Sequence, residues 1–295
     1  KSPWEKMWKM VNLILRAMPP ILPHFFLLIS LCLGVISPHA LAENKPNRII
    51  SLSPSLTEIL FAIGAAPQVI AVDSHSNFPK NVPRTNLSAY EPNLEAIASF
   101  KPDLVVLSYD IGDSVKGLNL VGIDTLLLST PQNFSEILTQ IMVLGESTGN
   151  TKKAKKLIID MEKKMSRLTM LREKRRAIKI YHEVDENYYS ASSFSFIGSI
   201  YRMLNLTNIA DEADKEGYGY PKLSPEYIIS SNPDLIILPG KTSDHIVKMI
   251  KRPGWKHISA VKNNKFLRVE SDIASRWGPR LPEFANSIVD FLEPN

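Results

Sequence analysis

The sequence predicts an α/β protein with two doubly wound lobes, each with a mostly parallel central sheet, joined by one long helix. Three observations predict it. Segments typical of buried strands alternate with segments typical of helices through both halves of the chain. Residues 95–108, EAIASFKPDLVVLS, return in similar form as residues 226–239, EYIISSNPDLIILP, 131 positions later. Between the two copies, residues 151–176 contain neither proline nor glycine.

The first 42 residues have the pattern of a secretory signal peptide. Four Lys or Arg residues lie within residues 1–17, an apolar run spans 21–37, and small residues stand at Ala40 and Ala42. We therefore expect cleavage after Ala42 and a mature protein in the periplasm or at the extracellular face of the cytoplasmic membrane. An uncleaved membrane anchor is the alternative, because the apolar run nearly reaches spanning length.

Cysteine usage and charge exclude several classes of function. Cys32 is the single cysteine and lies within the predicted leader, where the bulky Leu31 before it does not suit a lipid-modified cysteine. The mature chain therefore has no disulfide, thiolate metal site or cysteine nucleophile. Basic residues concentrate in 151–176, with 11 Lys or Arg against three acidic residues. No aromatic residues interleave with them, which predicts a solvated helix face and no nucleic-acid contact.

The N-terminal lobe is predicted over residues 43–150. The segment RIISLSPSLTEILFAIG predicts a buried strand and then a helix, with a capping box formed by Ser55 and Glu58 and an end at Gly64. Further strands are predicted in PQVIAVDS, DLVVLS and GIDTLLLS. Helices are predicted in LEAIASF and SEILTQIMVLGEST.

The connecting helix is predicted over residues 151–176. Its apolar residues recur every three or four positions, so we expect one stripe of the helix to be buried: Leu157, Met161, Met165, Leu168 and Leu171. At 1.5 Å per residue such a helix is about 37 Å long, which is enough to span two lobes. An ordinary crossover helix within one domain is the alternative.

The C-terminal lobe is predicted over residues 177–295. Strands are expected in AIKIYHEV, DLIILPG and KFLRVES, and helices in FIGSIYRMLN, SPEYIISSN and RLPEFANSIVDFL. Two such lobes leave a cleft between them, into which the loops at the strand ends converge. No nucleophile elbow, phosphate-binding loop or paired-histidine zinc motif occurs in the chain, so we expect a binding protein with no catalytic residues.

The predicted cleft loops are rich in aromatic residues, which suits a large, flat, partly apolar ligand. Packing within a loop explains any single one of them equally well, so the interpretation rests on their number: His75, Phe78, Tyr90, Tyr188, Tyr189, Phe194, Tyr218, Tyr220 and Trp277. His75 and His182 do not make a metal site by themselves, because no carboxylate stands at ligand spacing beside either. We expect no protein-bound metal; His75 is the first candidate to touch a metal carried by the ligand.

Five segments together resemble a known family: RIISLSPSLTEILFAIG, NLEAIASFKPDLVVL, FIGSIYRMLNLTNIA, YPKLSPEYIISSNPDLIIL and SDIASRWGPRLPE. They are similar, over about residues 47–293, to the periplasmic substrate-binding proteins of ABC importers that have a helical backbone. The cobalamin-binding branch is the most similar. Carriers of ferric siderophores or haem share the fold. The resemblance implies a monomer that performs no chemistry, has no cofactor and hands its ligand to a permease dimer with its ATPase subunits.

The resemblance also implies ligand-binding positions. The helix start at Ser53 and Pro54 faces the ligand in this family. His75 stands where cobalamin binders have an aromatic residue, and Arg276 stands where siderophore binders use arginine for anionic groups. The remaining positions matched to ligand contacts are Tyr90, Tyr189 and Tyr220. Trp277 is a further ligand-binding candidate because it lies in the last predicted cleft loop, beside Arg276.

The repeated glutamates have a role in the same family. There, each lobe presents one surface glutamate to arginines of the permease dimer, and Glu95 and Glu226 occupy the matching places. A two-lobed protein with pseudo-symmetry fits a two-fold partner in this way. Stabilisation of a helix N-terminus explains the same residues without a partner. The sequence thus predicts a receptor for a cobalamin-like corrinoid; a ferric siderophore or haem receptor and an extracytoplasmic enzyme on the same scaffold are the alternatives.

Overall fold

A computed structural model describes residues 45–240 and 244–293. The predicted signal peptide lies outside these residues. From Lys45 onwards the chain forms one compact unit that contains two parallel four-stranded sheets. This confirms the predicted α/β fold class. None of the helices within the described ranges is both long and apolar enough to cross a membrane.

The first sheet has the strand order β2-β1-β3-β4. Its strands are β1 (Ile49–Leu52), β2 (Val69–Val72), β3 (Leu104–Leu107) and β4 (Asp124–Leu127). The helices between them are α3 (Pro54–Ala62), α4 (Leu94–Ser99) and α5 (Ser114–Leu120), and α6 (Phe134–Ser147) follows the last strand. All neighbouring strands are parallel, so every connection is a crossover, as the strand and helix alternation predicts. The connection from β2 to β3 passes β1, which lies between them.

The second sheet repeats this order as β6-β5-β7-β8. Its strands are β5 (Ile178–His182), β6 (Leu206–Asn208), β7 (Leu235–Pro239) and β8 (Phe266–Val269). Its helices are α8 (Phe196–Met203), α9 (Pro225–Ser231), α10 (Asp244–Ile250), α11 (Ser259–Lys262), α12 (Ser271–Ser275) and α13 (Leu281–Leu292). The sequence does not predict β6, because three residues are too few to show an alternating pattern.

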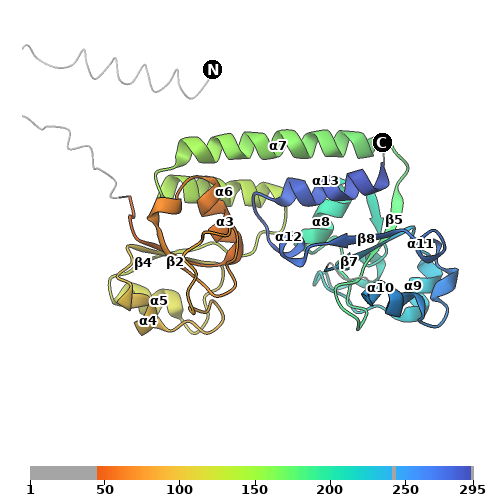
Figure 1. The fold of residues 1–295 in the computed structure, drawn as a ribbon, viewed down its shortest axis with the longest axis horizontal. Coiled ribbons are helices and arrows are strands. Elements are labelled where there is room, and N and C mark those ends of the chain that lie inside the picture. Colours follow the sequence, from red (N-terminus) through yellow and green to blue (C-terminus); the bar gives the residue numbers. More distant parts are fainter. Residues whose placement is uncertain (1–44, 241–243, 294–295) are drawn as a thin grey trace, which may run out of the picture. The chain divides into compact units, whose positions relative to one another are not determined.

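The long helix α7 (Thr151–Glu173) connects the two sheets and packs against α6 and α13 (Figure 1). One hydrophobic core runs beneath it through both lobes and includes Leu60 of α3, Ile141 of α6 and Ile288 of α13. On the opposite side of the sheets each lobe has a separate core, under α4 and α5 in the first lobe and under α9, α10 and α11 in the second. α7 and the repeated helices α4 and α9 therefore lie on opposite sides of the sheets.

The buried stripe of α7 differs from the prediction at its C-terminal end. Met161, Met165 and Leu168 are buried, but Leu171 is 47% exposed. The next residue, Arg172, takes its place at 1% exposure, because position 172 continues the spacing of four residues from Leu168. Its guanidinium donates to Glu293 Oε1 at 2.7 Å and to the carbonyl oxygen of Arg176 at 3.2 Å, which compensates its burial.

The predicted capping box of α3 is also wrong. The residue that caps the helix is Ser53, whose side-chain oxygen accepts a hydrogen bond from the Leu56 backbone N–H at 3.5 Å. Glu58 is 3% exposed and turns to arginines from the far end of the chain instead. The predicted helix end is confirmed, since Gly64 adopts a positive φ of 80° directly after the cap residue Ile63.

Candidate functional site

Aromatic side chains gather at the carboxyl ends of the first sheet. His75 follows β2, and its ring lies 5.8 Å from the ring of Tyr90 in an edge-on arrangement. Tyr90 in turn stacks with Tyr109, which follows β3, at a centroid distance of 6.4 Å. Tyr90 and Tyr109 are 60% and 44% exposed, so their faces are open to a ligand.

These aromatic residues line a pocket of about 260 Å³. Six of the eight predicted ligand-binding residues meet there: Ser53, Pro54, His75, Tyr90, Arg276 and Trp277. The last two come from the segment after α12, so the pocket joins the end of the first sheet to the C-terminal part of the chain. Its volume is small compared with pockets that enclose a whole large ligand, so such a ligand would extend beyond it.

The other two predicted residues belong to loops of the second lobe and do not line this pocket. Tyr220 is 52% exposed, yet burial around its hydroxyl raises its pKa and the neighbouring Tyr109 raises it further. Tyr189 is 40% exposed, and the Lys222 ammonium lies 5.8 Å from the centre of its ring.

Arg276 is held by contacts within the protein. Its guanidinium bonds Glu58 Oε1 at 3.1 Å and Asp272 Oδ1 at 3.1 Å. It also donates to Asn77 Oδ1 at 2.7 Å and to the carbonyl oxygen of His75 at 3.2 Å. The side chain is 9% exposed. Arg276 therefore fastens the His75 loop and leaves little of its charge unpaired.

Arg280 completes this interlobe clamp, which we define as Glu58, Arg276 and Arg280. Its Nε donates to Glu58 Oε2 at 2.7 Å, and a second nitrogen bonds Glu58 Oε1. Burial alone would lower the pKa of Arg280, but its hydrogen bonds and charge pairing with Glu58 raise it. The guanidinium also stacks 4.2 Å from the ring centre of Phe78. One buried carboxylate thus compensates two arginines.

Two buried polar atoms near the pocket have no hydrogen-bond partner among the described residues. Asp73 is fully buried, and its Oδ1 accepts from the Ser76 backbone N–H at 3.0 Å, while Oδ2 is unpaired. Desolvation raises the pKa of Asp73, although the contacts with Ser76 lower it. The indole Nε1 of Trp277 is likewise unpaired. Both groups lie in the inner wall of the pocket.

A second buried glutamate organises the second lobe. Glu183 directly follows β5 and is fully buried. Arg252 bonds both of its oxygens, at 2.6 and 2.9 Å, and His245 Nε2 lies 2.6 Å from Oε1. The Arg252 guanidinium stacks 4.8 Å from the ring centre of Tyr188. This cluster fixes the base of the loop that presents Tyr189.

His182 is a core residue. It is 4% exposed, and its Nδ1 lies 2.7 Å from the hydroxyl of Tyr201. Desolvation lowers its pKa to about 4, so the imidazole is neutral near pH 7. Within the described ranges no group of three or more His, Cys, Asp and Glu residues could hold a metal ion.

Glu95 and Glu226 occupy equivalent places in the first turns of α4 and α9. The helices begin at matching caps, where Asn93 Oδ1 accepts from Ala96 N at 2.9 Å and Ser224 Oγ accepts from Tyr227 N at 3.1 Å. Both glutamates are exposed. Neither makes an ion pair with another described residue. Their carboxylates are available to an external partner.

Sequence reasoning missed three features of the site. Tyr109 stands directly after the β3 segment at the same relative place as the other loop aromatics, so its position was a usable signal. The pairing of Glu58 with Arg276 and Arg280 joins residues 218 and 222 positions apart, for which the sequence holds no local signal. The sequence gives no local signal for the burial of Asp73 either, because that burial depends on how the surrounding loop packs.

Two parallel sheets bridged by a helix, with an aromatic pocket at the strand ends, define a two-lobed binding protein. Residues 49–273 match the family described as periplasmic binding protein, and the chain belongs to that family. It is a substrate-binding protein of the kind that serves ABC importers.

Similar proteins come from several bacteria. The chain is 29% identical over 263 residues to an uncharacterized ABC transporter substrate-binding lipoprotein, YvrC, of Bacillus subtilis, covering 86% of this chain and 82% of that one. It is 26% identical over 274 residues to the vitamin B12-binding protein of Vibrio cholerae, covering 88% and 94%. A crystal structure of a possible iron-binding, periplasmic solute-binding protein from Staphylococcus epidermidis superposes with a TM-score of 0.74 at 28% identity, covering 84% and 99%.

Proposed function

We propose that this protein captures a cobalamin-like corrinoid in the aromatic pocket and delivers it to an ABC permease outside the cytoplasm. Support for this class of receptor comes from similar proteins, whose names include vitamin B12-binding, Fe(3+)-citrate-binding and haem-binding proteins. The choice within the class rests on one observation: the pocket combines open aromatic faces with an arginine that is already neutralised.

Charge separates the candidate ligands. Ferric citrate and the propionates of haem are anionic, so a site for them gains from unpaired arginine or lysine. Of the described residues lining the pocket, Arg276 is the only Lys or Arg, and Glu58 and Asp272 pair with it. The rim of a corrinoid carries neutral amides, and its macrocycle offers a broad face to Tyr90 and Tyr109. The pocket suits the corrinoid better.

Haem is the second candidate, and His75 favours it. The imidazole is exposed at the pocket and stands beside Tyr90. A neutral imidazole is a good ligand for iron as well as cobalt. The metal in either case would arrive with the ligand. An enzyme on this scaffold is the remaining alternative, and no observation in the pocket favours a particular reaction.

A fluorescence titration tests the proposal. Residues 43–295 contain two tryptophans, and Trp255→Phe leaves Trp277 in the pocket wall as the reporter. Cobalamin, haem and a panel of ferric siderophores are titrated, with free tryptophan correcting for absorption by the coloured ligands. We expect saturable sub-micromolar quenching by cobalamin, weakened in Tyr90→Ala and in Tyr109→Ala. Leu120→Ala, an exposed substitution on α5, serves as the control and should bind normally.

The other outcomes are distinct. Binding of haem alone, lost in His75→Ala, would favour the second candidate. Binding of an iron chelate alone would retain the class of receptor and reject the corrinoid. Failure of every ligand, with a cooperatively folded protein, would reject the pocket as the binding site and reopen the enzyme alternative.

We further propose that Glu95 and Glu226 dock the two lobes onto a permease dimer. Support comes from their equivalent positions, their exposure and the absence of ion pairs with other described residues. Matching carboxylates on the two lobes suit a two-fold partner that offers the same cation twice.

A further inference from the structure

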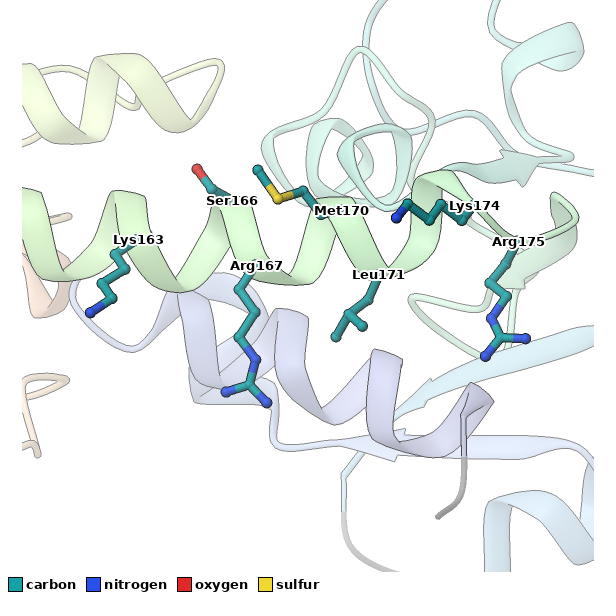
Figure 2. A pocket seen from close by; sticks show the side chains of 7 residues that line it. All are labelled: Lys163, Ser166, Arg167, Met170, Leu171, Lys174 and Arg175. Carbon is teal, nitrogen blue, oxygen red and sulfur yellow. The ribbon is translucent and has the colours of Figure 1, made fainter.

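The outer face of α7 carries a surface that the proposed function does not use. A shallow hollow of about 670 Å³ lies there, larger than the pocket of about 260 Å³ at the strand ends. Figure 2 shows its side chains fanning out from the helix. We call this set the α7 surface: Lys163, Ser166, Arg167, Met170, Leu171, Lys174 and Arg175.

The centre of the α7 surface is apolar. Met170 is 63% exposed and Leu171 is 47% exposed, and both lie outside the buried stripe of α7. Ile159 is 62% exposed and lies 11 residues, or about three turns, before Met170, which puts both on one face of the helix. Large apolar side chains exposed together indicate a contact surface.

The rim of the α7 surface is positively charged. Lys163, Arg167 and Lys174 are exposed and make no ion pair with another described residue. Arg175 is paired with Glu293 at 3.1 Å, and Asp160 is already paired with Lys156 at 2.8 Å. Residues 151–176 hold 11 Lys or Arg against Asp160, Glu162 and Glu173, so the helix keeps a net positive charge around this apolar centre.

We propose that the α7 surface binds the anionic surface of a lipid bilayer. Lipid headgroups offer negative charge and, just beneath it, an apolar layer, which together match a basic rim and an apolar centre. A second copy of the chain fits poorly, because two basic faces would repel. A nucleic acid fits poorly as well, because no aromatic side chains lie among the basic residues of α7.

The position of α7 means that the lipid contact would fix the orientation of the protein on the bilayer. α7 and the helices α4 and α9 lie on opposite sides of the sheets, so a protein lying on the bilayer by α7 points Glu95 and Glu226 away from it (Figure 1). Lipid-bound and permease-docked orientations would then exclude each other. This consequence rests on the proposed docking, whereas the lipid contact does not.

Sedimentation with vesicles tests the lipid contact. Residues 43–295 are mixed with vesicles of phosphatidylcholine containing a fraction of phosphatidylglycerol, and with vesicles of phosphatidylcholine alone. The leader is omitted because its apolar run would bind lipid by itself. We expect binding only to the anionic vesicles, weakened by salt. The triple variant K163E/R167E/K174E should lose at least about tenfold in affinity, since each basic residue contributes to the attraction. The double variant M170S/L171S should lower the affinity for anionic vesicles by less and leave its dependence on salt unchanged.

Controls keep the failure of this proposal separate from that of the proposed function. K251E/K256E/K262E makes the same change of charge on exposed residues of the second lobe, away from α7, and should bind vesicles normally. The K163E/R167E/K174E variant should bind the soluble ligand as the wild type does. Equal binding to both kinds of vesicle, binding unaffected by K163E/R167E/K174E, or self-association through α7 in sedimentation velocity would each overturn the lipid contact.

Discussion

The two lobes have the same backbone plan but fasten their cleft loops differently. In both, the Asp of the repeated Pro-Asp pair holds the start of the lobe's first strand. Asp103 accepts from the backbone N–H of Arg48 at 3.0 Å, and Asp234 accepts from that of Lys179 at 3.0 Å. The two partners are 131 positions apart, as are the two aspartates. The repeat therefore encodes the same strand anchor twice.

The buried glutamates show the difference. Glu183 takes Arg252 from its own lobe, 69 positions away. Glu58 takes Arg276 and Arg280 from the other end of the chain. The second lobe fixes its loop with local residues, whereas the first lobe depends on the interlobe clamp. A duplicated topology thus does not imply duplicated support for the site.

The largest loss of stability is expected when the buried cluster of Glu183, Arg252 and His245 in the second lobe is broken. Glu183→Ala removes a buried carboxylate and leaves Arg252 without its partner, so the free energy of unfolding should fall by about 3–5 kcal/mol. Urea denaturation measures it. Glu186→Ala is the control, because its side chain is 57% exposed and its change should stay within about 0.5 kcal/mol. A loss below about 1 kcal/mol for Glu183→Ala would show that the cluster is not integral to the lobe.

The next largest effect is a pH dependence of stability that only the second lobe contributes, through His182. The repeat aligns His182 of β5 with Ser51 of β1, so only the second lobe buries a histidine at this position. Its folded pKa of about 4 lies below the unfolded value of 6.5, so the unfolded state binds the proton more tightly. Stability should therefore fall as the pH drops from about 6.5 to about 4, by up to about 3 kcal/mol.

The comparison of the wild type with His182→Gln isolates this contribution. Asp73 acts in the opposite sense, because its raised pKa makes the folded state hold a proton at a pH where the unfolded state releases it. Denaturation series at several pH values should give a shallower acid loss for His182→Gln. Parallel curves for the two proteins would contradict the assignment.

The interlobe clamp should affect both stability and binding. Glu58→Gln removes the charge that two arginines share, so about 1.5–3 kcal/mol of stability should be lost. Ligand affinity should also fall at least several-fold, because Arg276 holds the His75 loop. Calorimetric titration measures the affinity. Glu283→Gln, exposed at the start of α13, should change neither quantity, and unchanged affinity in Glu58→Gln would separate the clamp from the site.

Removal of the aspartate that anchors the first strand of each lobe should lower the free energy of unfolding by less, and by nearly the same amount in the two lobes. Asp103→Ala and Asp234→Ala each remove an acceptor for backbone N–H groups, so each should lose about 1 kcal/mol. Asp103 should lose slightly more, because it also accepts from Asn47 N at 2.8 Å. Thermal denaturation of the pair is the measurement. A large difference between them would show that only one copy of the repeat anchors its strand.

The smallest effect on stability is expected at the docking glutamates. Glu95→Lys and Glu226→Lys place a cation near a helix N-terminus, which should cost only a few tenths of a kcal/mol. Ligand binding should persist, while uptake into cells should fall in each variant and fall further in the double variant. Glu91→Lys, exposed close to α4, should transport normally. Normal uptake in the double variant would rule out the docking role.

Local patterns predicted most of the fold. The strand and helix alternation and the long helix before Ile178 depend on short-range periodicity, which the sequence displays directly. The errors lie where tertiary contacts override a local rule. Spacing allows either Leu171 or Arg172 to follow Leu168 in the buried stripe, and Arg172 is the buried residue, with Glu293 as its partner. Glu58 fits a capping box by spacing and forms the clamp instead.

The candidate site was predicted in part for the same reason. Residues placed at strand ends by topology, such as His75 and Tyr90, do meet in one pocket. What those loops rest on depends on contacts across more than 200 positions, as between Arg276 and Glu58. The resemblance to the family could place Arg276 at the pocket but could not show that its charge is used within the protein.

The core beneath α7 contains residues from both the first and the last helices of the described chain, so it can form completely only after α13 has been synthesised. The first lobe is synthesised first, yet Glu58 can pair with Arg276 and Arg280 only after residue 280 has been made. α13, which closes the core with Phe284 and Ile288, comes later still. Domains of many proteins fold in turn as they emerge. Here α13 contributes to the core that both lobes share, so we expect a protein truncated before Leu281 to leave that core incomplete in both lobes.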